Sequence, residues 1–215
     1  MADAKPPDIA DLDLGARVEA QLRFLVAIDA LKHVQRRNLT IDGSRLENSA
    51  EHSWHLGLFA RVLAEHSLAP VDVDRTVTMV LVHDIVEIDA GDTIVYDTEA
   101  RAAKLIEERA AADRLFALLP LDQATVLRQV WDEFCAGESP EAELANAVDR
   151  LQPLLQNFLT GGQRWRDHGI SAERILAVNA PVTDAIPEFG VILRRIVALA
   201  SKQGWLPEDD GDGAP

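Results

Sequence analysis

Apolar residues recur every three to four positions along most of this chain, which is the spacing of helices that bury one face. No stretch alternates apolar and polar residues over a useful strand length. The predicted fold class is therefore all-α. The predicted helices cover residues 17–33, 49–66, 73–89, 98–119, 122–136, 140–159, 172–186 and 188–203.

Local signals mark several helix ends and turns. Asp42-Gly43 predicts a turn in the polar stretch after the first helix. Ser139-Pro140 is typical of a helix start, because a serine hydroxyl accepts from free backbone N–H groups and proline fits the first turn. Pro153 should bend the helix over residues 140–159 or remove one of its hydrogen bonds.

Chain length and composition indicate one domain. The 215 residues are 47% hydrophobic, enough for a sizeable core. We expect a flexible arm over residues 1–15, the domain over residues 16–206, and a disordered acidic tail over residues 207–215.

The formal net charge of −15 narrows the range of partners. A strongly acidic surface repels the phosphates of a nucleic acid polymer and of an anionic membrane. A small phosphate ester is compatible with it, because its site needs only local positive charge and a metal. Cys135 is the only cysteine, which excludes an intrachain disulfide, and we expect a cytoplasmic protein.

The most informative local pattern is His83-Asp84 inside an apolar run. Ionisable side chains are rarely buried without a partner. Glu87 lies one helical turn after His83 and so on the same face. The pattern fits either a functional site or a core histidine that is bonded to a neighbouring carboxylate.

Two other segments carry residues of the same kinds. His52 and His55 are three residues apart and share a helix face, as metal-binding histidines can, although packing residues often show this spacing too. Asp149, followed by Arg150, is by itself more typical of a solvated charge pair than of a ligand.

Taken in order, these segments resemble a known family. The segments are LKHVQRR (31–37), SRLENSAEHSWH (44–55), VHDIVEIDAGD (82–92) and AVDRLQP (147–153). They resemble the HD-domain superfamily of metal-dependent phosphohydrolases, and more closely its single-domain 5′-deoxynucleotidase branch, over about residues 24–206. The resemblance implies a compact HD-domain helical bundle with the metal site in its core, and a homodimer.

The resemblance also implies roles for individual residues. His55 becomes a supporting or packing residue. The implied metal ligands are His52, His83, Asp84 and Asp149; the implied catalytic residues are Glu87 and Asp84; the implied substrate contacts are Arg36, Arg45 and Asp92. Arg37 stands where that branch has a tryptophan that orients the substrate, so a strict preference for deoxynucleotides does not follow. Arg37 is then either a further phosphate contact or a solvated surface residue.

The implied chemistry is hydrolysis of a small phosphorylated substrate. Two imidazoles and two carboxylates suit one divalent ion such as Mn, Co, Fe, Zn or Mg. The predicted reaction releases phosphate from nucleoside or deoxynucleoside 5′-monophosphates by means of a metal-activated water. Glu87 would accept a proton from that water or protonate the departing 5′ oxygen.

Three other functions compete with this prediction. One is an HD-type hydrolase of a diester or a pyrophosphate, and another is a non-catalytic nucleotide or metal sensor. The third is a di-iron redox bundle, which would need a Glu-x-x-His pair on each of two helices. The motifs contain no such pair, which argues against the third function.

Overall fold

The computed structural model describes residues 7–92, 98–180, 183 and 186–207, without the side chains of residues 98–103. The helical fold is confirmed. Its α-helices are α1 (Ala16–Ala27), α2 (Ser49–Leu63), α3 (Val73–Val82), α4 (Glu87–Ala90), α5 (Thr98–Phe116), α6 (Leu121–Ala136), α7 (Pro140–Leu159), α8 (Gln163–Asp167), α9 (Ala172–Asn179) and α10 (Pro187–Lys202). Its 3₁₀ turns are η1 (Ile9–Leu12), η2 (Ile28–His33), η3 (Ala64–His66) and η4 (His83–Val86), and its strands are β1 (Gln35–Leu39) and β2 (Leu46–Asn48).

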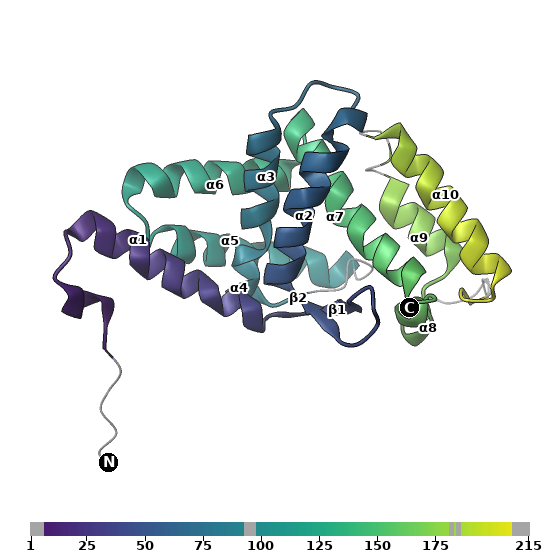
Figure 1. Ribbon diagram of the computed structural model, residues 1–215, viewed down its shortest axis with the longest axis horizontal. Helices are drawn as coiled ribbons and strands as arrows, with labels where there is room; N and C mark the ends of the chain where they lie inside the picture. Colours follow the sequence, from purple (N-terminus) through teal and green to yellow (C-terminus); the bar gives the residue numbers. More distant parts are fainter. Residues whose placement is uncertain (1–6, 93–97, 181–182, 184–185, 208–215) are drawn as a thin grey trace, which may run out of the picture.

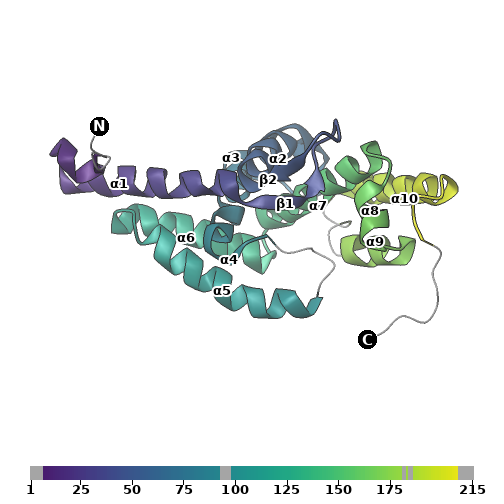
Figure 2. The same cartoon turned by 90° about the horizontal axis from the view of Figure 1, so that it is seen from below.

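The helices form an elongated molecule with three parts (Figures 1 and 2). Helices α2, α3 and α7 pack together in the middle. Helices α1, α5 and α6 extend from one side of this middle part, and α8, α9 and α10 cover the other side (Figure 2). One cluster of buried apolar residues runs through all three parts, from Phe24 on α1 to Ala200 on α10.

The strands correct the expectation that the chain has none. β1 and β2 pair antiparallel around the predicted Asp42-Gly43 turn. Gly43 has a φ of +70°, a left-handed conformation that glycine adopts without strain. The Asp42 carboxylate accepts hydrogen bonds from Thr40 Oγ1 and the Ser44 backbone N–H. The turn was predictable, but the strands are too short and too polar for the pattern to reveal.

The predicted helix over residues 73–89 is a second correction. It is α-helical only to Val82, tightens to a 3₁₀ turn at His83–Val86, and ends as α4. The tightened turn holds His83 and Asp84. Mid-helix 3₁₀ segments often occur at functional positions.

Other helix ends agree better with the prediction. The Asn48 side chain accepts from the Glu51 N–H and starts α2, and Ser139 does the same for α7 through the Ala142 N–H. α7 continues through Pro153. The first predicted helix instead ends at Ala27 and continues as η2, and α8 was not predicted.

Some expected features fall partly outside the described residues. These are the end of the helix expected over residues 172–186, most of the acidic tail, and the first six residues of the expected arm. Within the described part of the chain, no helix has the combination of length and apolar character that crossing a bilayer requires.

Candidate metal centre

Three central helical segments bring the key residues together. His52 lies in the first turn of α2, His83 is the first residue of η4, and Asp149 lies midway along α7. In the middle of the molecule, α2 packs against both η4 and α7 (Figure 1). Both histidines are buried, and Asp149 is partly buried.

The ligand-type atoms of His52, His83 and Asp149 all lie within 4.8 Å of one another. Asp149 Oδ1 is 2.9 Å from His52 Nε2 and 3.6 Å from His83 Nε2. The two imidazole rings are tilted, with centroids 5.6 Å apart. The residues that the sequence placed on separate helices therefore converge, as a shared cation would require.

The outer nitrogens of both imidazoles are engaged on the protein side. His83 Nδ1 is 2.9 Å from the Val80 carbonyl oxygen, and His52 Nδ1 is 3.1 Å from Gln152 Oε1. Both partners are oxygen acceptors, so each Nδ1 carries a proton and donates it. This arrangement directs both Nε2 atoms to the centre, as in histidines that bind metals.

The Nε2 atoms face carboxylate oxygens, which also only accept. Within the described structure, His83 Nε2 is buried and makes no hydrogen bond of acceptable geometry. Lone pairs that face each other at this range repel unless a positive charge lies between them. The donor set of two imidazoles and at least one carboxylate fits a divalent first-row cation in that position.

In the metal-free protein a proton supplies part of that positive charge. Burial disfavours the charged imidazolium of His83, but Asp84 and Asp149 outweigh burial and raise its pKa to about 10. Burial likewise opposes ionisation of Asp84, but His83 outweighs it and lowers the Asp84 pKa to about 2. The pKa of Asp149 also falls well below its usual value, because its attraction to the two histidines outweighs burial.

Asp84 lies at the edge of this cluster. Its Oδ1 is 3.0 Å from His83 Nε2, and its Oδ2 is 3.9 Å from His52 Nε2. Arg36 Nη1 donates to Asp84 Oδ2 at 2.9 Å, and both side chains are 11% exposed. Arg36 therefore lies beside the cluster, where the sequence placed a substrate contact.

Glu87 is buried next to the same cluster. Ser49 Oγ donates to Glu87 Oε2 at 2.7 Å, and Lys104 Nζ is 3.6 Å from Glu87 Oε1. Burial raises the pKa of Glu87 to about 8, and the charge of Asp84 adds to that shift. At neutral pH Glu87 therefore holds a proton. Burial also raises the pKa of Asp92.

Other residues named from the sequence do not join the cluster. Arg37 is exposed, and its carbonyl oxygen accepts from Arg164. Arg45 is exposed and pairs with Glu51 at 2.8 Å. His55 packs edge-on against Phe59, with ring centroids 4.8 Å apart, as expected of a packing residue. Substrate contact by Arg37 and Arg45 stays a prediction.

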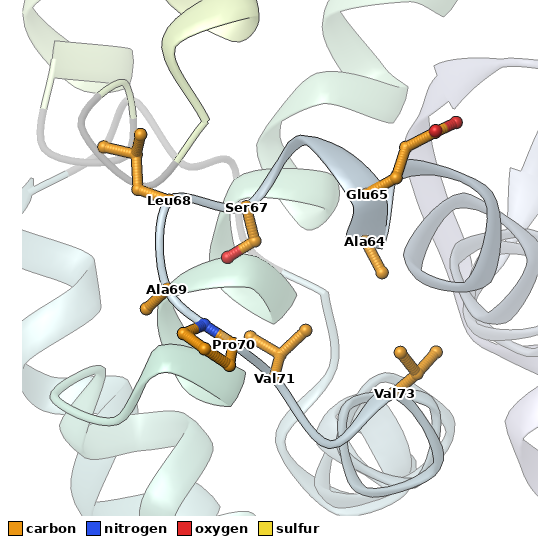
Figure 3. A pocket seen from close by; sticks show the side chains of 8 residues that line it. All are labelled: Ala64, Glu65, Ser67, Leu68, Ala69, Pro70, Val71 and Val73. Atoms are coloured by element: carbon orange, nitrogen blue, oxygen red, sulfur yellow. The ribbon is translucent and has the colours of Figure 1, made fainter.

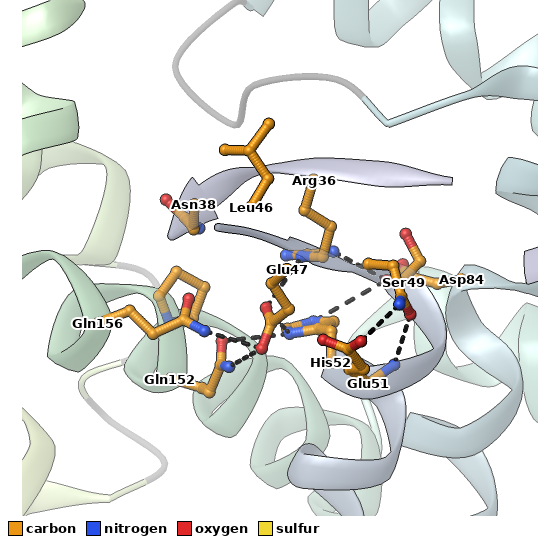
Figure 4. A network of polar contacts seen from close by, with 12 residues as sticks. Arg36, Asn38, Leu46, Glu47, Ser49, Glu51, His52, Asp84, Gln152 and Gln156 are labelled. Carbon is orange, nitrogen blue, oxygen red and sulfur yellow. Dashed lines mark hydrogen bonds and ion pairs between the residues drawn. The ribbon is translucent and has the colours of Figure 1, made fainter. Parts of the chain in front are cut away.

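Sequence reasoning missed a polar network behind His52 (Figure 4). Gln152 and Gln156 on α7 both donate to Glu47 Oε1 at 2.7 Å. Glu47 also lies 3.6 Å from Arg36 Nε. The signal was weak, because glutamines and a glutamate in polar or amphipathic segments resemble surface residues. Only the period-2 spacing of Glu47 in a recognised strand would have marked it as buried.

A surface hollow at the far end of α2 offers no comparable chemistry (Figure 3). It is lined by the connection from α2 to α3, residues 64–65, 67–71 and 73, in which Glu65 is the only ionisable group. His52 lies in the first turn of α2, whereas the hollow begins beyond the last turn of that helix.

Comparison with known proteins agrees with this geometry. An HD-domain family model matches residues 28–189. The chain belongs to the HD-domain family. A solved structure of a predicted metal-dependent phosphohydrolase from Magnetospirillum magnetotacticum is 43% identical to it, with a TM-score of 0.85 over 90% of this chain and all of that one.

Curated relatives in this family are named for a nucleotide activity. The 5′-deoxynucleotidase HDDC2 of Bos taurus is 30% identical over 157 residues, which are 73% of this chain and 74% of that protein. The human protein of the same name is 30% identical over 66% of this chain and 68% of its own length.

A more distant solved structure shares the fold alone. It is an HD-domain phosphohydrolase from Listeria innocua, 16% identical with a TM-score of 0.56 over 85% of this chain and 86% of that one.

Proposed function

We propose that this HD-family protein is a metal-dependent phosphohydrolase that releases phosphate from nucleoside 5′-monophosphates. The observation that carries the proposal is the meeting of His52, His83 and Asp149 beside the Arg36 guanidinium. The relatives named 5′-deoxynucleotidase support a phosphate monoester as the substrate class. A homodimer and a cytoplasmic location stay predictions from the sequence.

The proposed metal ligands are His52, His83 and Asp149, with Asp84 as the fourth. The ligand-type atoms of the first three residues converge, and Asp84 Oδ1 lies 3.0 Å from His83 Nε2. A divalent cation held there would make a water molecule a stronger acid and would neutralise phosphoryl oxygens.

Glu87 is the proposed general acid. It is protonated at neutral pH because burial and Asp84 raise its pKa to about 8. A protonated carboxyl group can give its proton to the departing 5′ oxygen of the nucleoside. Ser49 donates to the other side of the same group and keeps it in one orientation.

Arg36 and Asp84 would prepare the phosphate side of the reaction. Arg36 is nearly buried, so its charge is weakly screened and acts strongly on a phosphate group nearby. The Asp84 carboxylate, held by Arg36, would orient the attacking water. Asp92 is a proposed substrate contact, and the exposed Arg37 and Arg45 are proposed contacts at the outer rim of the site.

The test is a screen of phosphate release by the full chain, supplied in turn with Mn, Co, Fe, Zn and Mg. The substrates are ribo- and deoxyribonucleoside 5′-monophosphates, 3′-monophosphates, cyclic diesters and nucleotides with a pyrophosphate bond. Release is expected from several 5′-monophosphates. Asp149→Asn should lose the activity and the metal together, whereas Asp132→Asn, at an exposed acid on α6, should keep both.

Two outcomes would overturn the proposal. Turnover confined to diesters or pyrophosphates would favour the alternative HD-type hydrolases. Tight nucleotide binding without hydrolysis by the metal-loaded protein would favour a sensor. A di-iron centre is disfavoured, because the described residues hold a single group of three or more potential ligands, and it contains one carboxylate.

A further inference from the structure

Glu47 is a buried carboxylate that the reaction above does not use. It is 3% exposed in β2 and lies near His52 Nδ1, whereas Asp149 faces His52 Nε2. Its Oε1 accepts two amide N–H bonds of 2.7 Å, one from Gln152 and one from Gln156. Burying a carboxylate costs free energy unless its hydrogen bonds are made. Glu47 therefore favours the one arrangement of its neighbours that makes them.

The bond from Gln152 to Glu47 fixes which way the Gln152 amide points. A carboxylate oxygen can only accept, so the Gln152 amino end must face Glu47. The Gln152 carbonyl end, Oε1, must then face His52 Nδ1 at 3.1 Å. Because that oxygen can only accept, Nδ1 must carry a proton, and Nε2 is left to face Asp149 at 2.9 Å.

We propose that Glu47 is a positioning residue that acts through Gln152 to keep the proton on His52 Nδ1 and so presents Nε2 to the metal. Without the carboxylate, the Gln152 amide can turn over and offer its amino end to Nδ1. The ring would then carry its proton on Nε2, where it blocks a cation. The inference rests on the proposed metal site, but part of its test needs neither metal nor turnover.

Gln156 provides a matched control. It donates to the same carboxylate oxygen as Gln152 at the same distance, but it makes no hydrogen bond to His52. Both glutamines are buried on α7, one helical turn apart. The two therefore differ in whether they link Glu47 to the histidine.

Two other routes from Glu47 to the site must be separated from this relay. Glu47 Oε2 is 3.6 Å from His52 Nδ1, and 3.6 Å from Arg36 Nε. Through these contacts the negative charge of Glu47 could act on the site without Gln152. Both distances exceed that of a hydrogen bond, and a double-mutant cycle distinguishes these routes from the relay.

The first experiment measures Zn(II) affinity of the metal-stripped full chain by competition with a chromophoric chelator. Glu47→Gln should weaken binding roughly 10- to 100-fold, as loss of an outer partner of a ligating histidine does. In a Gln152→Leu background the same substitution should have no further effect. In a Gln156→Leu background it should keep its full effect. An equal loss in both backgrounds, or no loss at all, would overturn the relay.

The second experiment observes the His52 Nδ1 proton in the metal-free protein with ¹⁵N-labelled histidine. The proton signal should be present in the wild type and in Gln156→Leu, and should weaken or exchange faster with water in Gln152→Leu. This comparison holds even where Glu47→Gln does not fold. A wild type without the signal, or the same signal in both glutamine variants, contradicts the proposal. A wild type with the expected signal and Zn(II) cycle but without phosphate release would instead overturn the proposed function.

Discussion

Two arginine–aspartate pairs in this protein have nearly equal bond lengths and opposite surroundings. Arg36 is 2.9 Å from Asp84 in the centre of the molecule, and each side chain is 11% exposed. Arg17 on α1 is 2.8 Å from Asp122 on α6, where the side chains are 56% and 65% exposed. Water screens the outer pair and is largely excluded from the inner one, so equal distances do not mean equal energies.

The comparison also shows where chemistry can occur. The inner pair belongs to a set of ionisable groups that shift one another's pKa values in opposite directions. Asp84 is held ionised, whereas Glu87 is held protonated. Two carboxyl groups with opposite protonation at one pH are what acid–base catalysis needs. They differ because the neighbouring His83 keeps Asp84 ionised, whereas burial keeps Glu87 protonated. The following predictions test how far burial accounts for the difference between the two regions.

The largest expected effect is on stability, from Arg36→Leu. The variant removes the buried positive charge beside Asp84 and Glu47, which should lower the free energy of unfolding by about 3–5 kcal/mol. Urea denaturation of the metal-free protein measures the change. Arg36→Lys keeps the positive charge but lacks the planar guanidinium group, so a smaller loss of stability is expected. A loss below about 1 kcal/mol for Arg36→Leu would mean that the inner pair behaves like a surface pair.

The next effect is on catalysis, from Glu87→Gln. We expect kcat to fall by about 10²–10³-fold, in the range of lost acid–base groups. A general acid acts below its pKa, so wild-type activity should decline as the pH rises through about 8. The variant should lose that alkaline decline, because its amide does not titrate. Glu65→Gln, at an exposed acid in η3, is the control. An unchanged pH profile in Glu87→Gln would assign the proton to another group.

Metal affinity should depend on pH. The His83 pKa is raised to about 10 in the metal-free protein, so the imidazole holds a proton below that pH and a metal must displace it. The Kd for Mn(II) should therefore rise roughly tenfold for each unit that the pH falls between 9 and 7. Calorimetry in buffers of different ionisation enthalpy should detect proton release. Binding that is independent of pH would contradict this assignment of the His83 proton.

The same shift has a consequence for folding. The folded pKa of His83 lies above its usual value of 6.5, so the shift stabilises the metal-free protein below pH 6.5, and this stabilisation is lost as the pH rises to about 10. Thermal unfolding with a chelator present should show this decline. Saturation with metal should reduce it, because the bound ion replaces the proton.

The sequence predicted the residues of the inner region better than their arrangement. His83 and Asp84 stood out because charged groups interrupt an apolar run, and the order of the motifs brought in His52 and Asp149. The helices that carry them were predictable from their periodicity. The 3₁₀ turn at His83 was not, because it depends on packing against α2, α5 and η2 rather than on local propensity.

Arg36 and Arg37 show the consequence of not predicting strand β1. In β1 the side chains alternate, so Arg36 is partly buried and Arg37 is exposed. Without the strand, the residue pattern alone did not show that these neighbours face opposite sides. The resemblance also counted Arg45 as a substrate contact, although Arg45 lies exposed against Glu51. The burial of Glu47 was not predicted either, because strand β2 was not recognised.

The smallest expected effect comes from the outer pair, and it sharpens the comparison because its bond geometry is good. Arg17 makes two hydrogen bonds to Asp122, of 2.9 and 2.8 Å, and they lower the Asp122 pKa to about 2. A carboxyl group with a lowered pKa stabilises the fold above its usual pKa of 3.8 and loses that effect as the pH falls towards 2. Because both side chains are more than half exposed, water screens this pair, so Arg17→Leu should still leave the urea midpoint at pH 7 nearly unchanged, and salt should remove what difference remains. Were this variant to destabilise the protein as much as Arg36→Leu, burial would not be the reason that the two pairs differ.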